Sequence, residues 1–126
     1  MSLHVVVIAG PTASGKTRLG VEAAHRLGSE IVSADSRQVY RGLDIGTGKD
    51  LEEYARVEPP VPYHLIDVAD PEEVFTLFRF QEACFRLLEE FADREPFSSG
   101  KVPVLMVGGS GLYIEAVVRQ YRLADV

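Results

Sequence analysis

The chain has 126 residues, of which 46% are hydrophobic and 25% charged, and its formal net charge is −6. This length and composition fit one globular domain with its own core, over residues 1–126. The acidic balance excludes a generic polyanion binder, and the single cysteine excludes a disulfide framework within the chain. We therefore expect a protein of a reducing compartment.

The first predicted element is a strand over residues 4–10, HVVVIAG. A continuous run of β-branched residues that ends in glycine is typical of a strand buried on both faces. The run is too short to cross a bilayer, and it lacks the layout of a signal peptide. We therefore expect no membrane contact and a cytoplasmic location.

A glycine-rich loop with the pattern G-x-x-x-x-G-K-T follows this strand. Backbone N–H groups of such a loop and the N-terminus of the next helix attract an anion. In this motif Lys16 reaches the outer phosphates, and the hydroxyl of Thr17 holds Mg²⁺. An ordinary strand-to-helix turn without a ligand is the alternative. The predicted phosphate-binding residues are Gly10, Thr12, Ala13, Ser14, Gly15, Lys16 and Thr17.

The loop leads into a predicted helix, in which Leu19, Ala23 and Leu27 share one face at helical spacing and Gly28 ends the last turn. A second strand over 30–35 then ends in Asp35. Because strand ends of open α/β sheets face the ligand crevice, the Asp35 carboxylate is placed to accept a proton from a nucleophile or to help hold a metal ion. A turn aspartate without function is the alternative interpretation.

Residues 41–62 are rich in glycine, proline and charge, and we expect mostly loop there. A third strand is predicted over 63–67. It ends in Asp67, which is an open candidate for a second metal contact or a solvated strand end. For His64 we favour a structural role.

The segment DPEE resembles a helix start, with Asp70 as N-cap. The longest helix is expected at about 76–94, because apolar residues recur there at three and four positions. These residues are Leu77, Phe80, Cys84, Leu87 and Phe91, with Leu88 beside them. We interpret Cys84 as a small buried hydrophobic residue.

A further buried strand is predicted over 102–109, followed by a helix over 110–121. Ser110 begins this helix, either as its N-cap or as part of a second substrate-contacting loop. Strands and helices alternate throughout, which predicts an α/β fold with a parallel sheet and helices on both faces. The loops after three strands should then converge on one edge of the sheet.

Four segments, in this order, resemble the tRNA dimethylallyltransferases, also called isopentenyl-tRNA transferases, and the related adenylate isopentenyltransferases. They are AGPTASGKT (9–17), SADSRQVYRGLDIGTGK (33–49), HLIDVADPEE (64–73) and GKVPVLMVGGSGLYIEAV (100–117). The resemblance covers nearly the whole chain. The block around Asp35 is much more specific than the phosphate loop, which many kinases and ATPases share.

This resemblance implies a P-loop NTPase-like fold in which the loop holds the diphosphate of dimethylallyl diphosphate. The prenyl group passes to N6 of an adenosine in tRNA, or of free AMP in the adenylate enzymes. Lys16, the loop amides and Mg²⁺ at Thr17 stabilise the charge that grows on the leaving pyrophosphate. Asp35 matches the family's general base, and Ser110 stands where the family has threonine. The implied substrate contacts are Thr12, Asp35, Ser36, Gln38 and Tyr40.

The chain also departs from the family pattern. It reads GTGKD at 46–50, where the family has GTAKP, and Arg79 stands at a position where the family has an acid. The resemblance also implies that full-length members are longer and insert a helical domain that binds tRNA, which we do not expect within these 126 residues. A fragment or a naturally short relative both fit this length. A P-loop small-molecule kinase and a non-catalytic nucleotide-binding relative remain the alternatives.

Overall fold

The computed structural model describes residues 3–9, 15–35, 38–41, 51–70, 72, 74–109, 113–115 and 117. The strands and helices in it are β1 (Val5–Ala9), α1 (Lys16–Leu27), β2 (Ile31–Ser33), α2 (Leu51–Ala55), β3 (Tyr63–His64), α3 (Leu77–Ala92) and β4 (Val104–Gly108). Among these described elements, none of the helices is long and apolar enough to cross a membrane.

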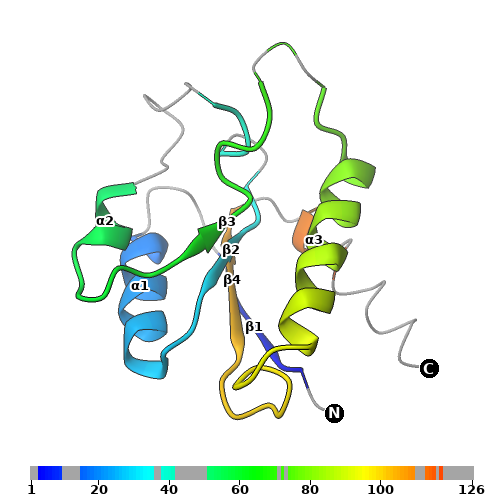
Figure 1. Cartoon of the computed structure of the whole chain (residues 1–126). Helices are drawn as coiled ribbons and strands as arrows, with labels where there is room; N and C mark the ends of the chain where they lie inside the picture. Colours follow the sequence, from blue (N-terminus) through cyan, green and yellow to red (C-terminus); the bar gives the residue numbers. More distant parts are fainter. Residues whose placement is uncertain are drawn as a thin grey trace.

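The four strands form one parallel sheet in the order β1-β4-β2-β3. Figure 1 shows three layers, with α1 and α2 on one side of the sheet and α3 on the other. The predicted α/β fold with helices on both faces is therefore confirmed. Because the strands are parallel, the segments that follow them leave the sheet at the same edge.

Strand β4 joins the two halves of the core, because all five of its residues are buried and successive side chains point to opposite faces. Leu105 and Val107 belong to the apolar cluster that includes Val21 and Ala24 of α1. Val104 and Met106 belong to the cluster that includes Phe80 and Cys84 of α3. The prediction of a buried strand in this part of the chain is therefore confirmed.

Strand β1 is less buried than we predicted. It lies at the end of the strand order and pairs with β4 on one side. Val6 is 46% exposed and Val7 36% exposed. None of the five residues of β1 is buried, so the expectation of a strand buried on both faces is wrong; β1 is an edge strand of the described sheet.

Helix α1 begins and ends as predicted, but it packs through a different face. Gly28 closes it in the left-handed conformation at φ 70°. Leu19 and Leu27 are 58% and 46% exposed, and the buried face contains Gly20, Val21 and Ala24 instead. A Cβ atom on Gly20 would lie 2.8 Å from Cγ2 of Val107. The helix thus approaches the sheet more closely than a face of leucines allows.

Helix α3 matches its prediction within two residues at each end. Phe80, Cys84, Leu88 and Phe91 form its buried face, whereas Leu77 is 39% exposed. Thr76 is its N-cap, since its hydroxyl accepts the N–H of Arg79 at 3.1 Å.

The predicted N-cap role of Asp70 is wrong, because α3 begins only at Leu77. The carboxylate of Asp70 instead forms an ion pair with Arg41 at 2.8 Å. This ion pair joins the segment after β2 to the segment after β3.

Two predictions in the middle of the chain need correction. Within the expected loop 41–62, helix α2 buries Tyr54 against the α1 side of the sheet, while residues 42–50 lie outside the described part. Strand β3 has two residues rather than five, because Leu65 and Asp67 adopt positive φ angles of 66° and 58°. The chain turns there, and the N–H of Asp67 donates to the carbonyl of Gln38.

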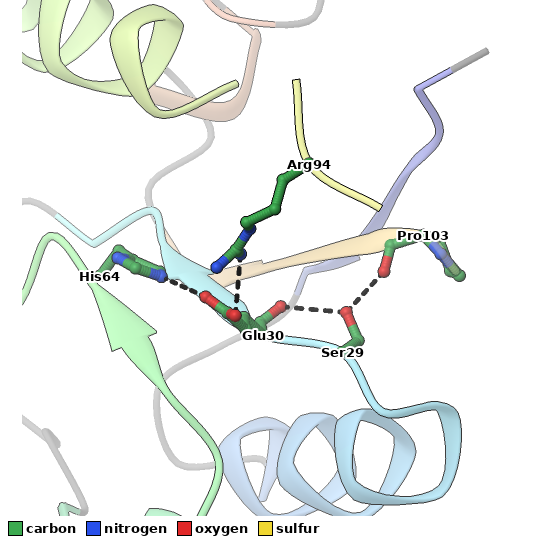
Figure 2. Close-up of polar contacts among 5 residues, drawn as sticks. All are labelled: Ser29, Glu30, His64, Arg94 and Pro103. Atoms are coloured by element: carbon green, nitrogen blue, oxygen red, sulfur yellow. Dashed lines mark hydrogen bonds and ion pairs between the residues drawn. The ribbon is translucent and has the colours of Figure 1, made fainter. Parts of the chain in front are cut away.

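At the amino end of β2, Glu30 ties three segments together (Figure 2). Its carboxylate accepts hydrogen bonds at 2.8 Å from Nε2 of His64 in β3 and from Nη2 of Arg94 beyond α3. The hydroxyl of Ser29 donates to the carbonyl of Pro103, just before β4. The contacts of His64 agree with the structural role that we favoured for it.

Candidate active site

The start of α1 combines three features of a phosphate site. Gly15 has a left-handed backbone at φ 76° immediately before the helix, and its carbonyl accepts the N–H of Leu19. Lys16 and Thr17 are only 7% and 8% exposed, although both carry polar side chains. A helix N-terminus that holds a buried ammonium group and a buried hydroxyl is suited to bind an anion.

The remaining predicted residues of this loop lie outside the described part of the chain. They are Gly10, Thr12, Ala13 and Ser14. Ser36, Ser110 and the GTGKD segment also lie outside it. Their predicted roles therefore stay predictions.

Asp35 lies where the second strand leaves the sheet. The N–H of Ala34 still donates to the carbonyl of Val107 in β4 at 2.9 Å, so Asp35 follows directly after the last ladder bond. Its backbone carbonyl accepts the N–H of Gln38 at 3.2 Å, which makes a turn. The side chain is only 2% exposed. A carboxylate buried this deeply is unusual for a residue that merely makes a turn.

The turn after Asp35 holds two more predicted site residues. The side-chain oxygen of Gln38 accepts the hydroxyl proton of buried Ser33 at 2.9 Å. Tyr40 pairs in a parallel bridge with Ala69. Gln38 and Tyr40 therefore lie along the segment that follows β3, where the N–H of Asp67 also donates to the carbonyl of Gln38.

Tyr113 is a buried residue with polar contacts that sequence reasoning did not single out. It is buried, stacks on Phe80 with ring centroids 4.1 Å apart, and donates its hydroxyl proton to the carbonyl of Phe75 at 3.3 Å. Burial, and then the neighbouring Tyr40 and Asp35, raise the pKa of its phenol. These partners lie far apart in sequence, so no spacing pattern connects them.

Arg79, which stands where the resemblance led us to expect an acid, has a defined place in the structure. Its Nη1 donates to the carbonyl of Val74 at 3.2 Å, and its guanidinium lies 5.3 Å from the ring centroid of Phe75. Arg79 therefore contacts the segment that leads into α3. A glutamate at this position could instead accept the backbone N–H of Thr76 and complete a capping box.

One oxygen donor at the start of α1 fits Mg²⁺. This ion is usually held by one or two protein oxygens together with substrate phosphates and water. The hydroxyl of Thr17 is such a hard donor. Among the residues that the structure describes, no three His, Cys, Asp or Glu side chains gather to form a metal site, and Asp67 thus has no such cluster around it there.

Comparisons with known proteins agree in naming one family. A family model described as IPP transferase matches residues 38–125. The tRNA dimethylallyltransferase 1 of Geotalea uraniireducens is 55% identical over the whole chain, and that of Syntrophus aciditrophicus is 56% identical. The chain covers only 38% and 39% of these two relatives.

Solved structures give the same result. The full-length tRNA isopentenylpyrophosphate transferase of Bacillus halodurans aligns with a TM-score of 0.79 at 43% identity, over 97% of this chain and 37% of that one. A eukaryotic dimethylallyltransferase acting on tRNA aligns with a TM-score of 0.75 at 30% identity, over 90% of this chain and 26% of that one. The predicted P-loop NTPase-like fold is confirmed by these neighbours.

Proposed function

Because this chain belongs to the IPP transferase family, we propose that it forms the diphosphate-binding and acceptor-activating core of a tRNA dimethylallyltransferase. The observation that carries this proposal is that two buried polar residues, Lys16 and Asp35, both lie at the edge of the sheet where the strands end. Lys16 begins the helix after β1, and Asp35 follows β2. We treat residues 1–126 as one domain that spans about two fifths of the length of its relatives.

The first task of the site is to hold the diphosphate of dimethylallyl diphosphate. The ammonium group of Lys16, the amides at the start of α1 and the loop from Gly10 to Ser14 would surround its oxygens. Negative charge grows on those oxygens as the bond between C1 of the prenyl group and oxygen breaks. Donors fixed in a site that excludes water stabilise that charge more than water does. Mg²⁺, held by Thr17, would supply further positive charge to the diphosphate.

The second task is to activate the acceptor. The lone pair of adenosine N6 forms the new bond to C1, pyrophosphate leaves with the electrons of the broken bond, and the excess proton on N6 goes to the Asp35 carboxylate. Ser110 would place its hydroxyl near the reacting centre. Ser36, Gln38 and Tyr40 would line the adenosine, and Thr12 would contact the prenyl diphosphate.

The acceptor that we propose is an adenosine of tRNA, because the named relatives are tRNA enzymes. A cytoplasmic location follows from such a substrate. The net charge of −6 gives this part of the protein little general attraction for RNA. We therefore expect most of the affinity for tRNA to come from parts of such an enzyme outside this core.

A transfer assay tests the proposal. Isotope-labelled dimethylallyl diphosphate is incubated with the chain, Mg²⁺ and unmodified tRNA, and label in the tRNA is counted. Asp35→Asn should lower the transfer rate about a hundredfold or more, because a general base contributes about 10²–10⁴-fold, while diphosphate binding is retained. Label transferred equally well by Asp35→Asn would contradict the assignment of the base.

The same assay separates the alternatives. Transfer to AMP but not to tRNA would place the chain with the adenylate enzymes. Consumption of ATP with a small hydroxyl acceptor would favour a kinase, which the named relatives do not support. Binding without transfer to either acceptor would leave a non-catalytic relative.

A further inference from the structure

Two tyrosine hydroxyls from distant parts of the chain hold the backbone of one residue, Phe75. The N–H of Phe75 donates to the hydroxyl of Tyr40 at 3.3 Å. The carbonyl of Phe75 accepts the hydroxyl proton of Tyr113, also at 3.3 Å. Tyr40 follows β2 and Tyr113 lies in the last helical segment, so three separate segments meet at Phe75.

Each tyrosine is itself fixed by further contacts. The ring of Tyr113 is stacked on Phe80 of α3 at an interplanar angle of 22°. The backbone on either side of Tyr40 is bonded to the segment after β3, because the N–H of Ala69 donates to Val39 and the N–H of Arg41 donates to Ala69. The two hydroxyls therefore have little freedom, and they restrict Phe75 in turn.

This arrangement borders on Asp35. Burial raises the pKa of the Tyr113 phenol most, and the charges of Tyr40 and Asp35 raise this pKa further. Asp35 and Tyr40 lie on the same turn, and Asp35 is buried. Tyr113 therefore bonds the segment that leads into α3, and Tyr40, which bonds the same backbone, follows the turn in which Gln38 bonds the Asp35 carbonyl.

We propose that Tyr113 is a positioning residue of the Asp35 site, which together with Tyr40 clamps the Phe75 backbone and so fixes the segments around the carboxylate. The proposal rests on the proposed function, in which Asp35 accepts the proton of the adenosine amine. Tyr113 takes no part in the chemistry. It acts by holding Asp35 in the right position relative to the acceptor. Small displacements of a catalytic group lower a reaction rate strongly.

The clamp itself is tested without any substrate, by hydrogen exchange at the Phe75 amide. Tyr40→Phe removes the acceptor of that N–H and should speed its exchange about tenfold, because one hydrogen bond is lost. Tyr63→Phe is the matched control, since Tyr63 is 40% exposed on β3 and its ring packs on Tyr54. Equal exchange in Tyr40→Phe and in the control would overturn the clamp.

The positioning role is tested by the kinetics of prenyl transfer in Tyr113→Phe. We expect kcat to fall about tenfold while KM for dimethylallyl diphosphate and its calorimetric affinity stay unchanged. A residue of merely structural importance would lower thermal stability and leave kcat per folded molecule as it was. That result would overturn the positioning role.

The two proposals fail in different ways. If the unmodified chain transfers no prenyl group even at tRNA concentrations high enough to offset its weak attraction for RNA, the proposed function fails and the positioning role falls with it, whereas the exchange rate at Phe75 still decides whether the clamp exists. If the unmodified chain is active and Tyr113→Phe is equally active, the proposed function stands and only the positioning role is overturned.

Discussion

The α-carbon of Gly108, the last residue of β4, lies directly against the backbone carbonyl of Ala34, the residue before Asp35. A Cβ atom at Gly108 would fall less than 3.0 Å from three backbone atoms of Ala34, a distance that real Cβ atoms essentially never show. The backbone of Ala34 cannot yield easily, because its N–H is bonded to Val107. The missing side chain of Gly108 is therefore what lets Asp35 lie beside the end of β4.

Gly108→Ala is predicted to lower the free energy of unfolding by about 2 kcal/mol or more, because the added methyl group must push two paired strands apart. Urea unfolding followed by circular dichroism measures the loss. Gly20→Ala is the comparison, since its methyl group would fall under 3.0 Å from one side-chain atom of Val107 instead of three backbone atoms. The account is contradicted if Gly108→Ala unfolds at the same urea concentration as the unmodified chain, or at a higher one than Gly20→Ala.

Burial raises the pKa of the Cys84 thiol from its ordinary value of 9.0 to about 12. The thiol in the unfolded chain ionises first as the pH rises, so the folded state loses stability between pH 9 and 12. The expected slope approaches about 1.4 kcal/mol per pH unit, the value for one proton. The raised pKa of Tyr113 acts in the same direction.

Unfolding midpoints measured from pH 7 to 11 test this. Cys84→Ala should be less stable at pH 7, because a cavity replaces the sulfur atom, but its stability should fall less steeply above pH 9. Parallel curves for the two proteins would show that Cys84 does not ionise on unfolding. Alkylation of the native thiol at pH 8 should also be slow.

Glu30→Gln should destabilise the fold by about 1 kcal/mol, because the carboxylate receives hydrogen bonds from both His64 and Arg94 (Figure 2). Glu30 is only 15% exposed, whereas its two partners are more open to water. The difference from the unmodified chain should therefore shrink, but not vanish, in 1 M salt.

The control for this substitution is Glu89→Gln, which removes an exposed carboxylate from α3. Its unfolding midpoint should stay within about 0.5 kcal/mol of the unmodified chain, as for most surface changes. If both variants behave alike, the three-segment link at Glu30 contributes nothing measurable to stability.

The elements that the sequence predicted well are those with a strong local pattern. The apolar run of β4, the three-and-four spacing of α3 and the glycine that ends α1 each depend on residues close together in the chain. The segment around Asp35 was identified through its resemblance to a family. Its position at a strand end also follows from the parallel sheet.

The errors share a different cause, which is tertiary packing. Leu19 and Leu27 looked like the inner face of α1, but the close approach of Gly20 to Val107 selects the face of small residues. Asp70 has the local pattern of an N-cap, but its pairing with Arg41 uses the carboxylate elsewhere. Tyr113 escaped notice because its partner Phe75 belongs to another segment. No window along the chain contains these contacts.

The measurement that bears most directly on the central claim is calorimetric titration with dimethylallyl diphosphate and, separately, with ATP, each in the presence of Mg²⁺. We expect tight binding of the prenyl diphosphate, weaker binding of ATP, and loss of prenyl diphosphate binding in Lys16→Ala. The control is Lys101→Ala, which removes an exposed lysine before β4. It should bind the prenyl diphosphate as the unmodified chain does. A preference for ATP, or unchanged binding in Lys16→Ala, would contradict the assignment of this loop to a prenyl diphosphate.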